Sequence, residues 1–598
     1  MLLSQDKQDV GSLAQNIIDW LMSDAELENV LIDNFLVNES FDRQFLRKFV
    51  SYLNADNFSF DILSKSFAVY VTYGKTDHVE KFFNVSYRVE NIPQQWRDEL
   101  ANIKLDTKLN FPKNNEYVPK HIEIPSDKDL ANCAQDSKPP NILLEDENRR
   151  LWHRKDEMFK QPKSKIFLIF RFPFSRNIAK ENALMIQFSK SYHYLIKNQL
   201  SDALIAQYDI FMDQVSEVSG FVLQFKGLTD RMPLVIERSV EIVVNQAMDN
   251  ATFANAKEAN VDVYSSFGSM PTYSLSTYYM KAAIQTKEML FTEIIYPIKE
   301  LTLGDLEEFH ARIFDKVHLE MFAYGSMDEA EALNVFKTVS EIVSAKKPKP
   351  FYNSELFYNR FVELEPGKEF VYESTLPIQV QTGTLIVYEI LVNDVMTTVK
   401  NELLATILSG PCFSILRTDE QLGYAASCDS LRGANNVNFF YVSVSGPYNP
   451  IFVQTRIENF MNEIQTILNN KTITEFKNIK QSLEGYYLKK PDTVYEQAEK
   501  FYEEIVNEQY FFDKKKVYAS MLAKIQVKDL SDFVQEIFGP NSRKFVVRLF
   551  VKDKTLKDNF KIDQRNNVHL INDVNDLKKF SNLFKIPRPQ MNVTRIGN

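Results

Sequence analysis

One short stretch holds the side chains best suited to bind or polarise a carbonyl group. Residues 409–424 read SGPCFSILRTDEQLGY. Ser409 is a favourable helix cap, and Pro411 suits a first helical turn, where its missing N–H would be unpaired anyway. The pattern therefore predicts a short helix that begins at Ser409 and ends at Gly423.

Within this helix, Phe413 and Arg417 would lie one turn apart on the same face. Tyr424 follows Arg417 by seven residues. A guanidinium fork and a phenolic hydroxyl can converge on one carbonyl or oxyanion, with Phe413 as an apolar neighbour. These residues could stabilise a transition state, but the stretch offers no clear nucleophile.

The same residues also fit a purely structural role. Arg417 could pair with Glu420 on a solvated helix face, and Tyr424 could begin a core strand. Spacing alone leaves the functional and the structural interpretation open.

Hydrolytic chemistry needs either a metal-activated water or a nucleophile, and histidine is the commonest ligand of a catalytic metal. The chain has seven, none of which lies in a His-x-x-Glu-His or His-Glu-x-x-His motif: His78, His121, His153, His193, His310, His318 and His569. The nearest pair, His310 and His318, is two turns apart with no base between. The sequence therefore predicts no metal ligand and no cofactor bound by this chain.

Other catalytic signatures are equally absent from the sequence. There is no Gly-x-Ser-x-Gly elbow and no glycine-rich phosphate loop. Cys412 is a conceivable thiol nucleophile, but Pro411 and Phe413 beside it favour packing, and no base can be identified. An independent hydrolase with Cys412 as its nucleophile is one alternative function.

Composition and charge exclude several classes of partner. The 598 residues suffice for about four domains, and 44% apolar residues can build large cores. A net charge of −10 argues against nucleic acid and anionic membranes as partners, although acidity inside a cavity can attract basic peptides.

The cysteines and the amino terminus favour the cytoplasm. Cys133, Cys412 and Cys428 are widely spread, lack metal spacing and cannot all pair, which fits a reducing compartment. The first residues show neither the basic nor the apolar part of a signal peptide, and no run is long and apolar enough to span a membrane.

The chain repeats one order of elements, which predicts α+β domains in tandem. Strand, helix and strand patterns occupy 166–172, 179–200 and 220–225, and then 384–390, a helix from about residue 394, and 437–444. A shift of 224 residues carries Asp305, Leu306 and Phe309 onto Asp529, Leu530 and Phe533. A helix and strand over 45–63 resemble a third copy of the closing segment.

The stretch PCFSILRTDEQLGY resembles the last-domain signature of the insulin-degrading enzyme branch of the pitrilysin (M16) zinc metallopeptidases. The resemblance implies antiparallel sheets packed by helices, and it covers the C-terminal half of such an enzyme. It implies the end of a second domain (1–125), a linker (126–150), a third domain (151–358) and a fourth domain (359–598). The first domain, which carries zinc, its ligands and the general base in this family, is missing.

By position in the motif, Arg417 and Tyr424 match the fourth-domain residues that hold the substrate backbone near the metal, and Phe413 matches a pocket wall beside them. The resemblance thus implies substrate enclosure and transition-state support, with hydrolysis dependent on a zinc-bearing amino-terminal half in the same or a separate chain. Peptides are the implied substrates, and a homo-oligomer is possible.

Two points keep alternatives open. A non-catalytic peptide-binding or scaffold protein derived from such a peptidase would use the same concave surface. Asp492 and Thr493 follow Lys490-Pro491 where relatives carry a more basic segment, which puts an inherited polyanion site in doubt.

Overall fold

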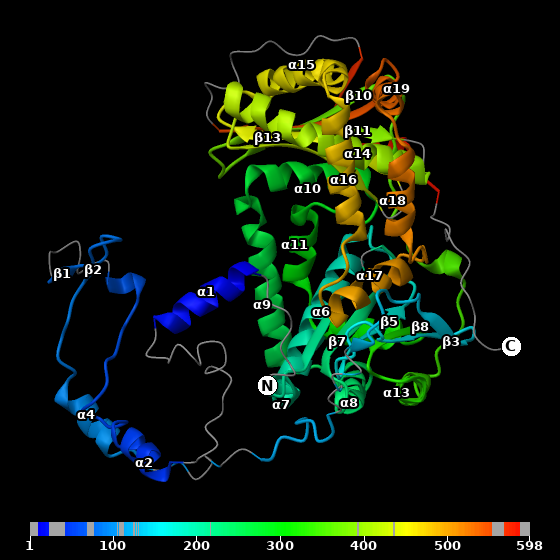
Figure 1. Cartoon of the computed structure of the whole chain (residues 1–598). Helices are drawn as coiled ribbons and strands as arrows, with labels where there is room; N and C mark the ends of the chain where they lie inside the picture. Colours follow the sequence, from blue (N-terminus) through cyan, green and yellow to red (C-terminus); the bar gives the residue numbers. More distant parts are fainter. Residues whose placement is uncertain are drawn as a thin grey trace. The chain divides into compact units, whose positions relative to one another are not determined.

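The structure, a computed structural model, describes most of the chain. The described residues are 10–22, 42–67, 77–104, 106, 110, 113–122, 126, 128, 131–215, 217–390, 394–433, 437–552 and 567–585. They divide into two compact units, one ending at Asn115 and one beginning at Glu116 (Figure 1). Within the described residues, every helix is too short or too polar to cross a membrane.

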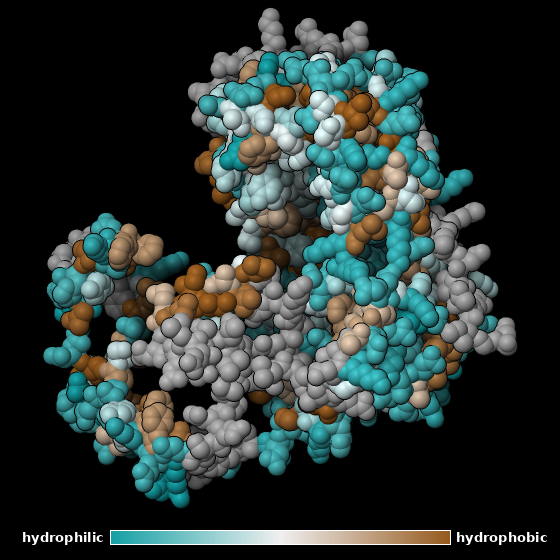
Figure 2. Space-filling view, viewed as in Figure 1, coloured by the Kyte–Doolittle hydropathy of each residue, from teal (hydrophilic) through white to brown (hydrophobic). Residues whose placement is uncertain are grey.

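The first unit consists of short elements with exposed apolar side chains. Its elements are α1 (Val10–Leu21), α2 (Arg43–Ser51), η3 (Lys65–Phe67), β1 (His78–Val79), β2 (Ser86–Tyr87) and α4 (Gln94–Ala101). None of its described side chains is buried. Figure 2 shows hydrophobic residues along α1, where Val10 and Ile18 are exposed.

The expected third copy of the closing segment forms only in part. The helix is present as α2, capped by Asp42, whose carboxylate accepts the Gln44 and Phe45 amides. The strand expected over 58–63 is wrong, because these residues are neither strand nor helix. A strand needs a neighbour for its backbone groups, and none lies beside this segment in the described part of the unit.

The second unit contains two six-stranded sheets. The first has the order β3-β4-β8-β5-β7-β6 and is antiparallel except between β4 and β8. Its strands are β3 (Asn141–Glu145), β4 (Arg149–Lys155), β5 (Lys163–Arg171), β6 (Asp209–Gln214), β7 (Gly220–Leu228) and β8 (His318–Gly325).

The second sheet has the corresponding order β15-β10-β14-β11-β13-β12, with β10 parallel to both its neighbours. Its strands are β10 (Glu369–Leu376), β11 (Thr382–Ile390), β12 (Ala425–Arg432), β13 (Asn438–Gly446), β14 (Arg543–Val551) and β15 (Val568–Ile571). The matching orders confirm the predicted repeat. Both sheets are mixed. The parallel pairs lie at the end of the first sheet opposite β6 and at the end of the second sheet opposite β12.

Helices follow the strands in both halves of this unit. The first half has α6 (Ala179–Gln199), α7 (Ser201–Ile205), α8 (Met232–Asn245), α9 (Asn250–Ser266), η4 (Phe267–Ser269), α10 (Thr272–Ile284), α11 (Phe291–Glu300), α12 (Leu303–Ile313), α13 (Glu329–Ser344) and η5 (Asn353–Glu355). The second half has α14 (Val395–Cys412), η6 (Phe413–Asp419), α15 (Pro450–Asn469), α16 (Ile473–Leu488), α17 (Val494–Val506), α18 (Lys514–Lys524), α19 (Val527–Phe538) and α21 (Asp576–Phe580), with the small sheet β9 (Val362–Glu363) and β16 (Asn582–Leu583).

The central strands of each sheet are buried on both faces, and one cover comes from the other half of the unit. In β5, Leu168 packs among the helices of its own half, whereas Phe167 packs against α17. The Phe167 and Tyr502 rings stack with centroids 4.0 Å apart. Reciprocally, α10 packs on β11 and β14 of the second sheet. This exchange of helices joins the two halves.

The stretch expected to be a linker is structured in its second half. Residues 141–150 contain β3 and the first residues of β4, which form an edge hairpin of the first sheet. An edge hairpin has a neighbour on one side only and an exposed turn, so its composition can be as polar as that of a linker.

A buried ion-pair network lies where α17 meets the first sheet. Glu320 is 1% exposed and accepts hydrogen bonds from Trp152 Nε1 at 2.7 Å and Arg171 Nη2 at 3.0 Å. Arg171 also donates to the Val506 carbonyl at the end of α17. Burial alone would raise the pKa of Glu320, but Arg171 and Arg150 hold it below its ordinary value.

We expect Glu320→Ala to destabilise the protein by about 3–5 kcal/mol, because it removes the buried carboxylate nearest to Arg171 and leaves only the partly exposed Glu508, 3.6 Å away. The urea midpoint of unfolding measures this loss. Lys180→Ala, which removes an exposed ion pair to Asp305, is the control and should leave the midpoint nearly unchanged. Equal effects of the two substitutions would contradict the importance of the network.

A pH dependence follows from Glu389, which is 3% exposed at the end of β11. Burial raises its pKa to about 8, although its carboxyl accepts the Leu364 amide and lies near Arg543. Because the folded pKa exceeds the unfolded one, stability is complete below about pH 4.5 and falls as the pH rises to about 8. Between pH 5 and pH 8 the free energy of unfolding of the unsubstituted protein should fall by an amount on the order of a few kcal/mol. Glu389→Gln should abolish this fall, so the urea midpoint of the variant should change less with pH. Parallel pH profiles for the two proteins would contradict this.

Candidate functional site

The helix that carries the candidate site begins earlier than predicted. Asp394 caps α14, whose residues run without a break through Ser409 into the π-helix η6. The separate helix expected to begin at Ser409 is therefore wrong. Helix α14 is held by its buried face, which includes Val399 and Leu403, so packing outweighs the local capping preference of Ser409.

Pro411 lies inside the helix rather than in its first turn. It has no N–H to donate and its ring crowds the preceding turn, which disturbs the regular backbone hydrogen bonds of the α-helix. The wider π-helical turn follows at once, and the Glu420 amide donates to the Ile415 carbonyl, five residues back, at 2.9 Å. Such π-helical insertions often mark functional sites.

The three candidate residues lie together on this segment. The Arg417 guanidinium lies over the Phe413 ring, with its carbon 4.6 Å from the ring centroid, and over the Tyr424 ring at 4.8 Å. Phe413 is 44% exposed and Tyr424 77% exposed. Two aromatic rings thus hold one half-buried guanidinium at the surface by cation–π attraction.

The ion pair between Arg417 and Glu420, expected from a purely structural role, does not form. Glu420 forms a two-point ion pair with Arg456 of α15, at 2.6 and 2.7 Å, instead of pairing with Arg417. Glu420 raises the pKa of Arg456. This pair ties the end of η6 to α15, a role that the sequence did not indicate because Arg456 is 36 residues away.

Two glycines let the chain pass from η6 into β12. A Cβ at Gly423 would lie 2.0 Å from the Ser445 carbonyl oxygen, and a Cβ at Gly446 would lie 2.0 Å from the Leu422 carbonyl oxygen. Gly423 is therefore needed for a close backbone approach, not for ending a helix. This crossing sets the position of Tyr424 relative to Arg417.

The other candidate groups take structural positions. Cys412 is fully buried, and its thiol hydrogen-bonds the buried Cys428 thiol; this bond and burial raise the pKa of Cys428. A thiol that is fully buried is out of reach of a substrate, so Cys412 is not placed to act as a nucleophile. His153 and His310 bond the backbone carbonyls of Met327 and Val243.

The described residues do not fit a zinc site. No three of their histidine, cysteine, aspartate or glutamate side chains gather as metal ligands. No catalytic step is therefore assigned to a metal held by this part of the chain.

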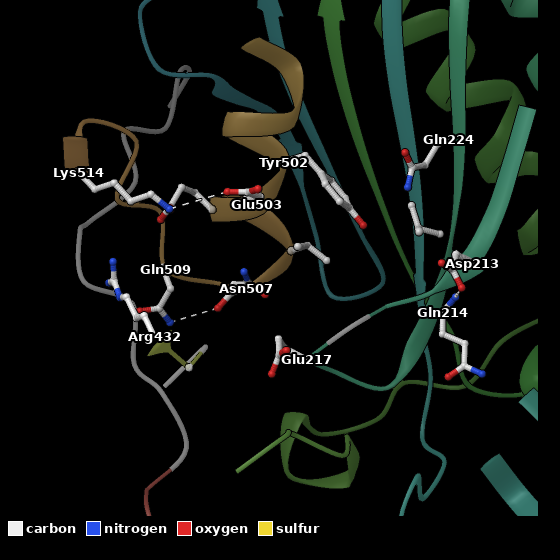
Figure 3. A pocket seen from close by; sticks show the side chains of 14 residues that line it. Asp213, Gln214, Glu217, Gln224, Arg432, Tyr502, Glu503, Asn507, Gln509 and Lys514 are labelled. Carbon is white, nitrogen blue, oxygen red and sulfur yellow. Dashed lines mark hydrogen bonds and ion pairs between the residues drawn. The ribbon is translucent and has the colours of Figure 1, made fainter. Parts of the chain in front are cut away.

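A cavity of about 460 Å³ lies where α17 approaches the first sheet, and Arg432 and Gly433 at the end of β12 form part of its wall (Figure 3). Its carboxylates are Asp213, Glu217, Glu503 and Glu504. Sequence reasoning missed this cavity, because its wall combines segments almost 300 residues apart.

Two family models match the chain. One, described as the middle or third domain of peptidase M16, matches residues 4–296, and another, described as the peptidase M16 inactive domain, matches residues 300–483.

Known relatives match most of the chain. Insulin-degrading enzyme of Bos taurus is 26% identical over 537 residues, which cover 88% of this chain and 51% of that protein. The A-factor-processing enzyme of Saccharomyces cerevisiae is 24% identical over 526 residues, covering 87% and 50%. The chain thus spans about half the length of these relatives. The crystal structure of pitrilysin has the same fold, with a TM-score of 0.75 and 17% identity over 97% of this chain and 59% of that one.

Gly423→Ala should destabilise the protein by about 1–3 kcal/mol, because the added methyl group meets a backbone oxygen that cannot move aside. Gly410→Ala is the matched control: nothing lies within 4 Å of its Cβ, and alanine favours a helix by about 1 kcal/mol. Urea unfolding of both variants measures the difference. A Gly423→Ala protein as stable as Gly410→Ala would contradict the close approach.

Proposed function

The chain belongs to the M16 peptidase family, and on that premise we propose that it is the C-terminal half of an insulin-degrading-enzyme-like zinc metalloendopeptidase. This half encloses peptide substrates and stabilises the transition state. Hydrolysis requires a half that bears the His-x-x-Glu-His motif, in the same or a separate polypeptide. Residues 1–125 are the end of its second domain, 151–358 its third and 359–598 its fourth.

The observation that carries this proposal is the position of Arg417. Its guanidinium carbon lies 4.6 Å from the Phe413 ring centroid and 4.8 Å from the Tyr424 ring centroid, so two aromatic rings hold the charged group by cation–π attraction. No carboxylate forms an ion pair with it among the residues that the structure describes. A planar set of donors held in this way suits a carbonyl oxygen or an oxyanion.

Such donors stabilise the transition state most when negative charge develops on the substrate during the reaction. As a peptide carbonyl is attacked, its oxygen gains negative charge, and donors already in place need no reorganisation. Arg417 would donate from its guanidinium and Tyr424 from its hydroxyl, while Phe413 would form an apolar wall. The loss of one such donor typically costs about 3–4 kcal/mol of transition-state stability.

We expect Arg417→Ala to lower kcat for peptide cleavage by about 100-fold when this chain is combined with a zinc-bearing M16 half, and to weaken peptide binding much less. A fluorogenic peptide gives the rates, and anisotropy of the same peptide gives the affinity. Arg312→Ala, which removes an exposed arginine that pairs with Glu181, is the control and should change neither.

Equal losses in turnover and in affinity would contradict transition-state support. They would favour the alternative of a non-catalytic peptide-binding or scaffold protein.

A further inference from the structure

The chain turns sharply just before it enters β12. Gln421 has a φ of 52°, in the left-handed region that residues other than glycine seldom adopt. A residue in this conformation persists only where its surroundings hold it, and such residues cluster at functional sites. The amides on either side of it both donate to carbonyls of the π-helical segment, Glu420 to Ile415 at 2.9 Å and Leu422 to Leu416 at 3.0 Å.

The residues before and after this turn are held in different ways. Leu422 is 2% exposed and belongs to the core of the second half of the unit. Glu420 is held by charge, because its two carboxylate oxygens accept hydrogen bonds from Nε and Nη2 of Arg456 at 2.6 and 2.7 Å. A two-point contact of this kind fixes the orientation of both groups as well as their separation. Arg456 is therefore the restraint on the first side of the turn.

Helix α15, which carries Arg456, is bonded to the second sheet. Gln454 is 1% exposed, accepts a hydrogen bond from Arg548 of β14 at 2.8 Å and donates one to Glu369 of β10 at 2.6 Å. These buried contacts lie two residues before Arg456 in the sequence. The sheet thus fixes the helix, and the helix holds Glu420 through Arg456.

The turn controls the arrangement of the candidate site, because Arg417 precedes it and Tyr424 follows it. The direct restraint between these two side chains is weak, since the Tyr424 side chain is 77% exposed and cation–π attraction is small at exposed positions. The relative position of the guanidinium and the ring therefore depends mainly on the backbone between them. That backbone includes the left-handed Gln421 and the Glu420 that Arg456 holds.

We propose that Arg456 is a positioning residue for the candidate site. Through Glu420 it holds the turn at Gln421, and the turn keeps the Arg417 guanidinium beside the Tyr424 ring. Arg456 itself does not touch the substrate. This inference rests on the proposed function, because it takes Arg417 and Tyr424 as substrate contacts, and it adds a residue on another helix that controls their geometry.

Hydrogen exchange of the full chain, resolved by mass spectrometry, tests the hold of Arg456 on the turn. Arg456→Gln removes the two-point ion pair, so the Glu420 and Leu422 amides should exchange at least about tenfold faster, while amides in the middle of α14 should not change. Arg312→Gln is the matched control, because it removes an arginine that contacts both carboxylate oxygens of Glu181, at 2.8 and 3.0 Å, and it should leave all these amides unchanged. Unchanged exchange at Glu420 and Leu422 in Arg456→Gln would overturn the proposal.

The effect on the candidate site is tested by turnover of a fluorogenic peptide with a zinc-bearing M16 half. Arg456→Gln should lower kcat about tenfold and change the peptide affinity less than about threefold. In an Arg417→Ala background the same substitution should lower kcat less than about threefold, because Arg417 is the main group that it positions. An equal fold loss of kcat in both backgrounds would overturn the proposal, since Arg456 would then act independently of Arg417.

Failure of this inference can be told apart from failure of the proposed function. If Arg417→Ala lowers turnover and Arg456→Gln does not, the positioning role alone is overturned. If Arg417→Ala leaves turnover unchanged, the proposed function fails. The exchange measurement needs no zinc-bearing half, so it tests the contact of Arg456 with the turn in either case.

Discussion

The central strands of both large sheets in the second unit are buried on both faces, and that constraint determines most of the architecture. The central strands β5 and β11 are buried along their whole length, so a layer of helices on one side is not enough. The first sheet takes its second cover from α17 and the second sheet takes its second cover from α10. Neither half of the unit can bury its own sheet completely, and the two halves are therefore held together by their cores.

The same exchange of helices creates the polar features. Where α17 crosses the first sheet, the buried carboxylate of Glu320 meets Arg171, and Arg171 reaches the end of α17. The cavity with Asp213 and Glu503 lies beside this crossing. Strand β12 runs from the segment that carries Arg417 to the wall of this cavity.

Much of this fold could be predicted from the sequence, because the information was local or repeated. The long apolar runs indicated β5 and β11, and the shift of 224 residues indicated that α12 and α19 are equivalent, as the strand orders confirm. The helix with Asp394 at its start was also correct. A strand over 58–63 was wrong, since periodicity cannot say whether a neighbouring strand is present.

The sequence named the candidate residues of the site, but it did not indicate their geometry. The motif indicated Phe413, Arg417 and Tyr424, whereas the helix start at Ser409 and the pairing of Arg417 with Glu420 were wrong. Both errors arise from distant contacts: the core holds α14 in one helix past Pro411, and Arg456 takes Glu420. The cavity had no local signal at all.

The central claim is that this chain completes a zinc-bearing M16 half. The most direct test is the rate of peptide cleavage by such a half alone and after addition of the purified chain. The account predicts a rate that rises with added chain until a one-to-one ratio is reached and that chelators abolish. A rate unchanged by the chain, in a mixture where the two proteins are shown to associate, would contradict it.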